Sequence, residues 1–211
     1  MQLKRSRLAS ASTDFPPQEL GTESRSYGMT NLLWRQFEFV VGLLLVVFAI
    51  FAVFALATWN AADPSFSHAT DAPVTNAMGF AGAAVSDILM QFFGLASLAV
   101  LAPLVFWSYA LVLNQRWYYR MRRLALWLLG SLLTAAVLGC VPATDNWPLP
   151  SGLGGVTGDM VLKVPGMLLG GYPTGFAALA IGVLLIVPAA LAMAIACGFF
   201  WKDIDIGAVD S

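Results

Sequence analysis

The sequence predicts an all-α membrane protein with four transmembrane helices. Hydrophobic residues make up 59% of the 211 residues and charged residues only 11%, and the mean hydropathy is +0.76. A soluble domain usually carries about 25% charged residues, so this chain has too few to cover a water-exposed surface. Four stretches without Asp, Glu, Lys or Arg can each cross a bilayer core about 30 Å thick, which takes about 20 helical residues. These stretches lie between Glu38 and Asp63, Asp87 and Arg116, Arg123 and Asp145, and Lys163 and Lys202.

The first 36 residues precede the predicted membrane domain, residues 37–201. They are polar and rich in Ser, Pro and Glu, a composition that predicts a disordered cytoplasmic tail. The first span is predicted at 39–59. Its end, Ala55-Leu56-Ala57, resembles a signal-peptidase site, but the apolar stretch exceeds 20 residues, whereas the apolar core of a signal peptide has about 7–15. We therefore favour an uncleaved anchor helix over a cleaved signal peptide.

Three more spans follow, and an irregular segment separates the last two. Pro and Gly punctuate residues 142–175, which excludes a straight transmembrane helix there. Residues 156–169 can still form a short helix, which we expect to be interfacial or re-entrant; a periplasmic position is also open. Residues 202–211 would begin a cytoplasmic linker. The remaining spans are predicted at 88–113, 124–141 and 176–201.

The arginines predict the orientation of the chain in the membrane. Arg116, Arg120, Arg122 and Arg123 lie between the second and third spans, whereas the loops on the other side carry only Lys163. Because cytoplasmic loops are enriched in Lys and Arg, both termini are expected in the cytoplasm. Nucleic-acid contact is an alternative role for this loop, but attraction to anionic lipid headgroups already explains its composition.

No residue pattern in the chain predicts a catalytic residue, a cofactor-binding residue or a metal ligand. There is one histidine, and the two cysteines, Cys140 and Cys197, form no CxxC motif. We expect these cysteines at opposite membrane faces, too far apart for a disulfide. The glycine-rich residues 151–158 resemble a phosphate-binding loop, but the Gly-Lys pair that such a loop requires occurs nowhere in the sequence.

Asp87 and Gln91 are the one hint of a transport function. They are four residues apart, so they share one helix face, and carboxylates within membranes often mark ion paths. A small transporter or channel that uses these two residues is therefore an alternative function. A structural role is favoured, because an acid suits a helix N-terminus and no second intramembrane acid or base completes a relay.

Three short stretches carry a resemblance to a known family. They are TWNAADPSF at 58–66, NAMGFAGAAVSDIL at 76–89 leading into Phe92-Phe93-Gly94, and GGVTG at 154–158. In this order, and with four spans, they resemble the N-terminal membrane domain of the FtsK/SpoIIIE family of bacterial DNA translocases, over about residues 37–201. The residues that carry the likeness are Asp63, Pro64, Ser65, Gly79, Gly82, Asp87, Gly94, Gly154 and Gly155.

The resemblance implies a membrane anchor for a cytoplasmic, ATP-driven DNA motor at the division septum of the bacterial inner membrane. It also implies a homo-oligomer, a hexamer in that family, and contacts with membrane proteins of the divisome. The family's ATP-binding and DNA-contacting residues have no counterparts among these 211 residues. We therefore expect ATP, Mg²⁺ and DNA to be bound only by a C-terminal motor beyond Ser211, and no enzymatic activity in this chain.

Overall fold

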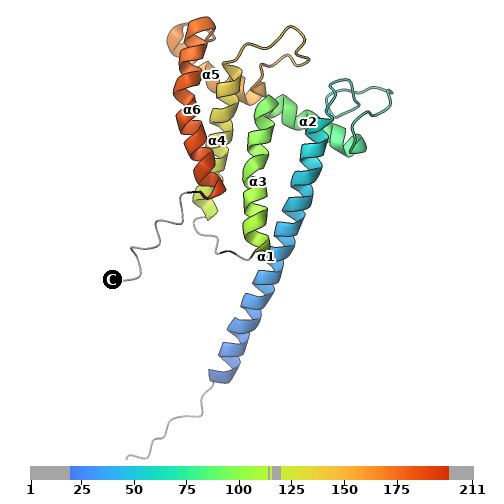
Figure 1. Ribbon diagram of the computed structural model, residues 1–211, viewed down its shortest axis with the longest axis vertical. Helices are drawn as coiled ribbons and strands as arrows, with labels where there is room; N and C mark the ends of the chain where they lie inside the picture. Colours follow the sequence, from blue (N-terminus) through green and yellow to red (C-terminus); the bar gives the residue numbers. More distant parts are fainter. Residues whose placement is uncertain (1–19, 114, 116–119, 200–211) are drawn as a thin grey trace, which may run out of the picture. The chain divides into compact units, whose positions relative to one another are not determined.

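The structure is a computed structural model that describes residues 20–113, 115 and 120–199, with side chains from residue 32 onward (Figure 1). Arg116, Lys202 and the predicted linker lie outside the described residues. The chain divides into two compact units, residues 1–37 and 38–211. The first unit holds the beginning of helix α1 (Leu20–Ala57), where the rings of Trp34 and Phe37 lie 5.7 Å apart.

Helix α1 begins earlier than the first predicted span. It starts at Leu20, so residues 20–36, which the composition assigns to a disordered tail, are helical. Extending an existing helix adds a backbone hydrogen bond for each residue that is fixed, whereas starting a new helix is costly. The apolar part of α1 therefore provides a start from which the helix continues into the polar segment.

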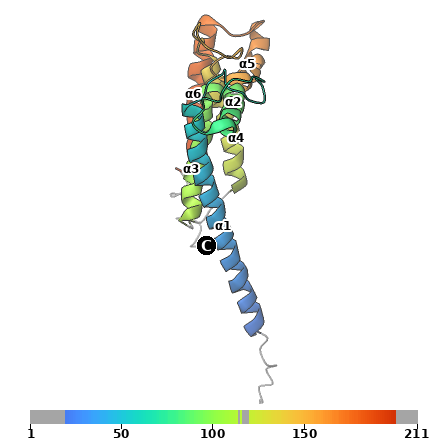
Figure 2. The same cartoon turned by 90° about the vertical axis from the view of Figure 1, so that its right-hand side faces the viewer.

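The second unit contains the rest of α1 and every other regular element of the described chain. α4 and α6 run side by side in opposite directions in both views (Figures 1 and 2). Gly130 in the middle of α4 contacts Met193 near the end of α6, while Cys140, just after α4, contacts Gly182. The elements are α2 (Gly79–Phe93), the 3-10 turn η1 (Gly94–Ala96), α3 (Ser97–Val112), α4 (Arg120–Gly139), α5 (Gly155–Leu169) and α6 (Gly175–Cys197).

Four helical stretches of the described residues are long and apolar enough to cross a membrane, which confirms the predicted fold class. They are Leu32–Ala57, Gly79–Val112, Arg120–Gly139 and Gly175–Cys197. Large apolar side chains are exposed along them, while the buried positions are mostly alanine. Small residues at helix contacts allow close backbone approach, as is usual in lipid. The buried alanines of these helices include Ala52, Ala55, Ala135, Ala136, Ala192 and Ala196.

The second of these stretches contains a bend that the predicted span at 88–113 did not include. Gly94 has a φ of +56°, a conformation that favours glycine, and η1 separates α2 from α3 there. Ser97 Oγ lies 2.7 Å from the carbonyl oxygens of both Leu89 and Gly94 and can donate to either carbonyl at the bend. As a result, α2 runs across the end of α3 instead of continuing along it (Figure 1).

The bundle has two ends that differ in composition. The loop end carries residues 58–78 and 140–154 together with α2. The arginine end is the opposite one, where α4 begins and α6 terminates (Figure 1). Cys140 lies at the loop end and Cys197 at the arginine end, and both are free thiols, in agreement with the expected separation.

Candidate functional site

Asp63 organises the loop that follows α1. Its side chain is only 4% exposed. Oδ1 accepts hydrogen bonds from the Thr75 backbone N–H (2.9 Å) and hydroxyl (2.7 Å), and Oδ2 accepts one from the Asn76 N–H (2.9 Å). Burial alone would raise the pKa of Asp63, but these hydrogen bonds outweigh burial and hold it below its usual range. The carboxylate therefore joins the two ends of the 63–76 loop.

Asn76 connects this loop to the end of α1. Its Nδ2 group donates to the carbonyl oxygens of Ala55 (2.8 Å) and Thr58 (3.3 Å), which lack partners within the helix because α1 ends there. Its Oδ1 accepts from the Met78 N–H at 3.0 Å. A Cβ at Gly82 would lie 2.4 Å from that same oxygen, so only glycine fits beside Asn76.

Asp87 ties the beginning of the same loop to α2. The side chain is 7% exposed, and Oδ2 accepts hydrogen bonds from the hydroxyls of Ser65 (2.7 Å) and Ser67. Gln91 Nε2 lies 3.0 Å from Oδ2 and 3.1 Å from Oδ1. The motif stretches at 58–66 and 76–89 therefore meet in two hydrogen-bonded sets, one around Asp63 and one around Asp87. We call the two sets together the carboxylate network: Asp63, Ser65, Ser67, Thr75, Asn76, Asp87 and Gln91.

A second cluster of motif residues brings backbone against backbone. A Cβ at Gly154 would lie 1.9 Å from the carbonyl oxygen of Ala135 in α4, and one at Gly158 would lie 2.5 Å from it. A Cβ at Gly94 would lie 2.1 Å from the carbonyl oxygen of Leu153, and the Leu95 N–H donates to that same oxygen at 2.9 Å. We call Gly94, Gly154, Gly155 and Gly158 the glycine seam; it joins η1, the start of α5 and α4.

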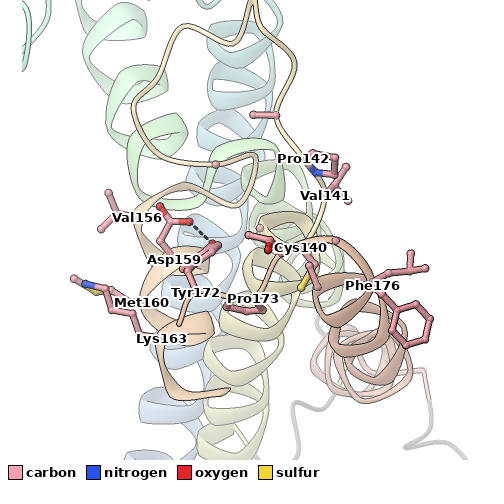
Figure 3. A pocket seen from close by; sticks show the side chains of 17 residues that line it. Cys140, Val141, Pro142, Val156, Asp159, Met160, Lys163, Tyr172, Pro173 and Phe176 are labelled. Carbon is pink, nitrogen blue, oxygen red and sulfur yellow. Dashed lines mark hydrogen bonds between the residues drawn. The ribbon is translucent and has the colours of Figure 1, made fainter. Parts of the chain in front are cut away.

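A cavity of about 1090 Å³ opens beside α5, between the end of α4 and the start of α6 (Figure 3). Asp159 and Tyr172 point toward each other in it, and the Tyr172 hydroxyl donates to Asp159 Oδ1 at 2.9 Å. Burial raises the pKa of Tyr172, and the bond to Asp159 and its negative charge raise it further, so the hydroxyl keeps its proton. Cys140 and Phe176 line the far side of the cavity.

At the arginine end, side chains from α3 and α4 close around the last turn of α6. The indole Nε1 of Trp107 donates to the Ala196 carbonyl at 2.8 Å, and Phe106 meets Phe199 edge to face at 5.1 Å. Arg123 is 9% exposed and lies against Gly198, where a Cβ would be 3.0 Å from Nη2. We call this arrangement the α6 clamp. A cation suits this position because a helix C-terminus carries partial negative charge.

The three predicted loop arginines that the structure describes lie in different environments. Arg120 forms an ion pair with Glu38 of α1. Arg123 is buried in the α6 clamp and its Nε has no hydrogen-bond partner. Arg122 is exposed, and Arg116 lies outside the described residues. At least two of the predicted lipid-facing arginines therefore also contact other parts of the protein.

Several residues in these sites have no role that the sequence predicts. Asn76 and Ser67 complete the carboxylate network, and Trp107 anchors the α6 clamp. Asn76 stands at the head of one motif stretch, so its position was a usable signal. No sequence signal marks Trp107, because its hydrogen-bond partner Ala196 is 89 residues away in the sequence.

The described residues contain no group of three or more His, Cys, Asp or Glu that could hold a metal ion. Three of their carboxylates, those of Asp63, Asp87 and Asp159, instead accept hydrogen bonds from hydroxyl, amide or backbone donors. The fold and these sites define a class: a multi-pass helical membrane domain whose polar residues organise its loops.

Comparison with known proteins identifies the family. The 4TM region of DNA translocase FtsK/SpoIIIE matches residues 35–205. Because this match covers most of the chain, the chain belongs to the FtsK/SpoIIIE family of DNA translocases and is similar to its four-transmembrane region. No solved structure gives a significant match.

Individual relatives agree with this assignment. The chain is 45% identical over 179 residues to a DNA translocase FtsK from Rhizobium meliloti, covering 85% of this chain and 20% of the relative. Identity to the Brucella suis protein of the same name is 52% over 159 residues, or 75% of this chain and 19% of the relative. Identity to the DNA translocase FtsK of Caulobacter vibrioides is 34% over 195 residues, which cover 85% of this chain and 23% of the relative. The chain thus spans about a fifth of these relatives.

Proposed function

We propose that this chain is the membrane anchor of a bacterial DNA translocase and holds the motor at the division septum. The observation that carries the proposal is the family match over residues 35–205, which coincides with the four candidate spans. An anchor needs a rigid membrane body and a fixed point from which the chain continues. The α6 clamp supplies such a point at the end of the last span.

We further propose that the arginine end faces the cytoplasm and that both termini lie there. Arg120, Arg122 and Arg123 lie at this end, whereas the described loop-end residues between 58 and 78 include Asp63 and Asp71 and no lysine or arginine. This asymmetry follows the positive-inside rule. It would place the end of α6 on the side where ATP and the chromosome are found.

The partners in this proposal follow from the family. They are the lipid bilayer, further copies of the chain in a hexamer, and membrane proteins of the divisome. DNA, ATP and Mg²⁺ would be bound by a motor domain that follows the membrane domain in the translocase. The chain itself would then neither hydrolyse ATP nor move DNA.

A transporter that uses Asp87 and Gln91 finds no support in the geometry. The Asp87 carboxylate is occupied by Ser65, Ser67 and Gln91, and this set fixes a loop to a helix end. Such a set satisfies a buried charge and provides no relay for ions. Proteoliposomes that hold the chain are therefore expected to show no ion flux that depends on Asp87, as judged by comparison with Asp87→Asn.

Septal recruitment is tested by imaging residues 1–211 with a fluorescent tag in dividing cells. The proposal expects fluorescence concentrated at the division site, whereas an unrelated four-span protein with the same tag should be spread evenly. Even membrane fluorescence of the chain would contradict the anchor role. DNA-stimulated ATP hydrolysis by the purified chain would contradict the assignment of catalysis to a separate motor.

Orientation is tested with a thiol reagent that cannot cross the membrane. In a Cys140→Ser/Cys197→Ser background, His68→Cys at the loop end should react in intact cells. Gln115→Cys at the arginine end should react only after the cells are opened. The reverse pattern would show that the chain is inserted the other way round.

A further inference from the structure

Helix α2 has an exposed surface without polar side chains. Its one charged residue, Asp87, is buried and held by hydrogen bonds. Exposed aromatic and aliphatic side chains on a helix that faces water would be costly, and a continuous apolar surface of this kind marks an interaction site. The exposed residues of α2 are Gly79, Phe80, Ala81, Ile88 and Phe92.

Phe66 extends this apolar surface from the neighbouring loop. Its side chain is 79% exposed, and its ring meets that of Phe80 edge to face at a centroid distance of 6.3 Å. Ser65 and Ser67, on either side of Phe66, both donate to the Asp87 carboxylate. The turn is thereby fixed to the polar side of α2, and the aromatic ring between the two serines is held outward.

The surface is continuous with the membrane-spanning part of the protein. α2 leads through η1 into α3, and Leu95 of η1 and Leu98 of α3, which are 43% and 59% exposed, continue the apolar surface. α2 itself lies across the end of the bundle (Figures 1 and 2). An exposed apolar surface that joins a spanning helix and carries no exposed charge fits the boundary of the bilayer.

We propose that Phe66 and Phe80 form an aromatic contact that inserts into the lipid at the loop end, with α2 lying along the membrane surface. The occupant of this surface is the bilayer itself. The Asp87 carboxylate acts as a positioning group, because it holds the turn that presents Phe66. This inference does not depend on the septal role, since it concerns the depth of two side chains in any bilayer.

The test measures the depth of single spin labels in the purified chain in lipid nanodiscs, where no other bacterial protein is available. The background is Cys140→Ser/Cys197→Ser, so that the label reacts at one site. Phe66→Cys places a label within the proposed contact, and exposure of Phe66 means that this change removes little internal packing. His68→Cys, two residues away and also exposed, is the matched control.

The label at residue 66 is expected to be relaxed by oxygen, which concentrates in lipid, at least threefold more than by a water-soluble nickel chelate. The label at residue 68 should show the opposite preference. Equal access of the chelate to both sites would overturn the proposal. Adding Ser65→Ala/Ser67→Ala should make residue 66 accessible to the chelate; unchanged depth would overturn the positioning role of Asp87.

Discussion

At the loop end, short polar side chains and closely approaching backbone hold the loops in place, whereas at the arginine end long side chains reach between helices. The short side chains of Asp63 and Asn76 make hydrogen bonds directly to nearby backbone groups, and the glycine seam leaves no room for a Cβ. The α6 clamp uses three aromatic side chains and a guanidinium group. We therefore expect the loop end to tolerate fewer substitutions than the arginine end, where long side chains can repack around a change.

The two ends also differ in what they hold. The loop end fixes a turn, a bend and a helix lying across the bundle, all within the domain. The arginine end fixes the point at which the chain leaves α6. In the proposed anchor, this is the point through which the membrane domain is connected to the motor.

The largest effect is expected from Gly154→Ala in the glycine seam. The new Cβ would lie 1.9 Å from the backbone oxygen of Ala135, so α5 would have to move away from α4. Overpacking against backbone costs about 3 kcal/mol, which should lower the Tm of the detergent-solubilised chain by several degrees. Gly171→Ala is the control, because a Cβ there meets nothing within 4 Å. Equal Tm values for the two variants would show that the seam is not tight.

Asp63→Asn should loosen the 63–76 loop at a smaller cost in stability than Gly154→Ala. The amide replaces an ionised acceptor, so the hydrogen bonds from Thr75 and Asn76 lose about 1.5–3 kcal/mol in total. Backbone hydrogen exchange at Thr75 and Asn76 should accelerate, while exchange in α6 stays unchanged. Asp71→Asn, an exposed acid in the same loop, should leave both regions as they are. If the Thr75 and Asn76 amides stay protected from exchange in Asp63→Asn, then Asp63 does not hold this loop in place.

Trp107→Phe is the corresponding change at the arginine end. An aromatic ring is retained, but the indole N–H that bonds the Ala196 carbonyl is lost together with part of the ring volume, at a cost of at least about 1 kcal/mol. Hydrogen exchange of the Gly198 and Phe199 amides should accelerate, with the loop end unaffected. Tyr109→Phe is the control, since Tyr109 is on the same helix and 60% exposed. If both variants exchange alike, the indole bond does not hold the end of α6.

The contrast between the ends also explains what the sequence could predict. Asp63 and Gly82 contact residues close to them in the sequence, and Gly154 contacts backbone. Such contacts require a particular residue type within a short stretch, and this requirement appears in the sequence as a motif. The four spans were predictable because length and apolarity are enough to identify them. The α6 clamp was not, because Trp107 and Ala196 are joined only through the packing of α3 on α6.

Two features were missed for a related reason. The bend at Gly94 arises where Leu153, from a distant loop, approaches the backbone, and no local pattern indicates such a contact. Arg123 was grouped with the other loop arginines because all four share the same sequence signal. Only the position of α6 separates a buried arginine from an exposed one.

The smallest difference between the ends should appear on acidification. The folded pKa of Asp63 lies below its unfolded value of about 3.9, so its contribution to stability is present above that pH and is lost as the pH falls through the folded pKa. Hydrogen exchange at Thr75 and Asn76, corrected for the intrinsic effect of pH, should therefore lose protection between about pH 4 and the onset of acid unfolding. The α6 clamp should keep its protection over the same window, because arginine stays charged and the Trp107 bond involves no titrating group. Asp63→Asn provides the control: it lacks the carboxyl, so its exchange at residue 76 should not change over this window. An equal loss of protection in that variant would assign the acid response to another group.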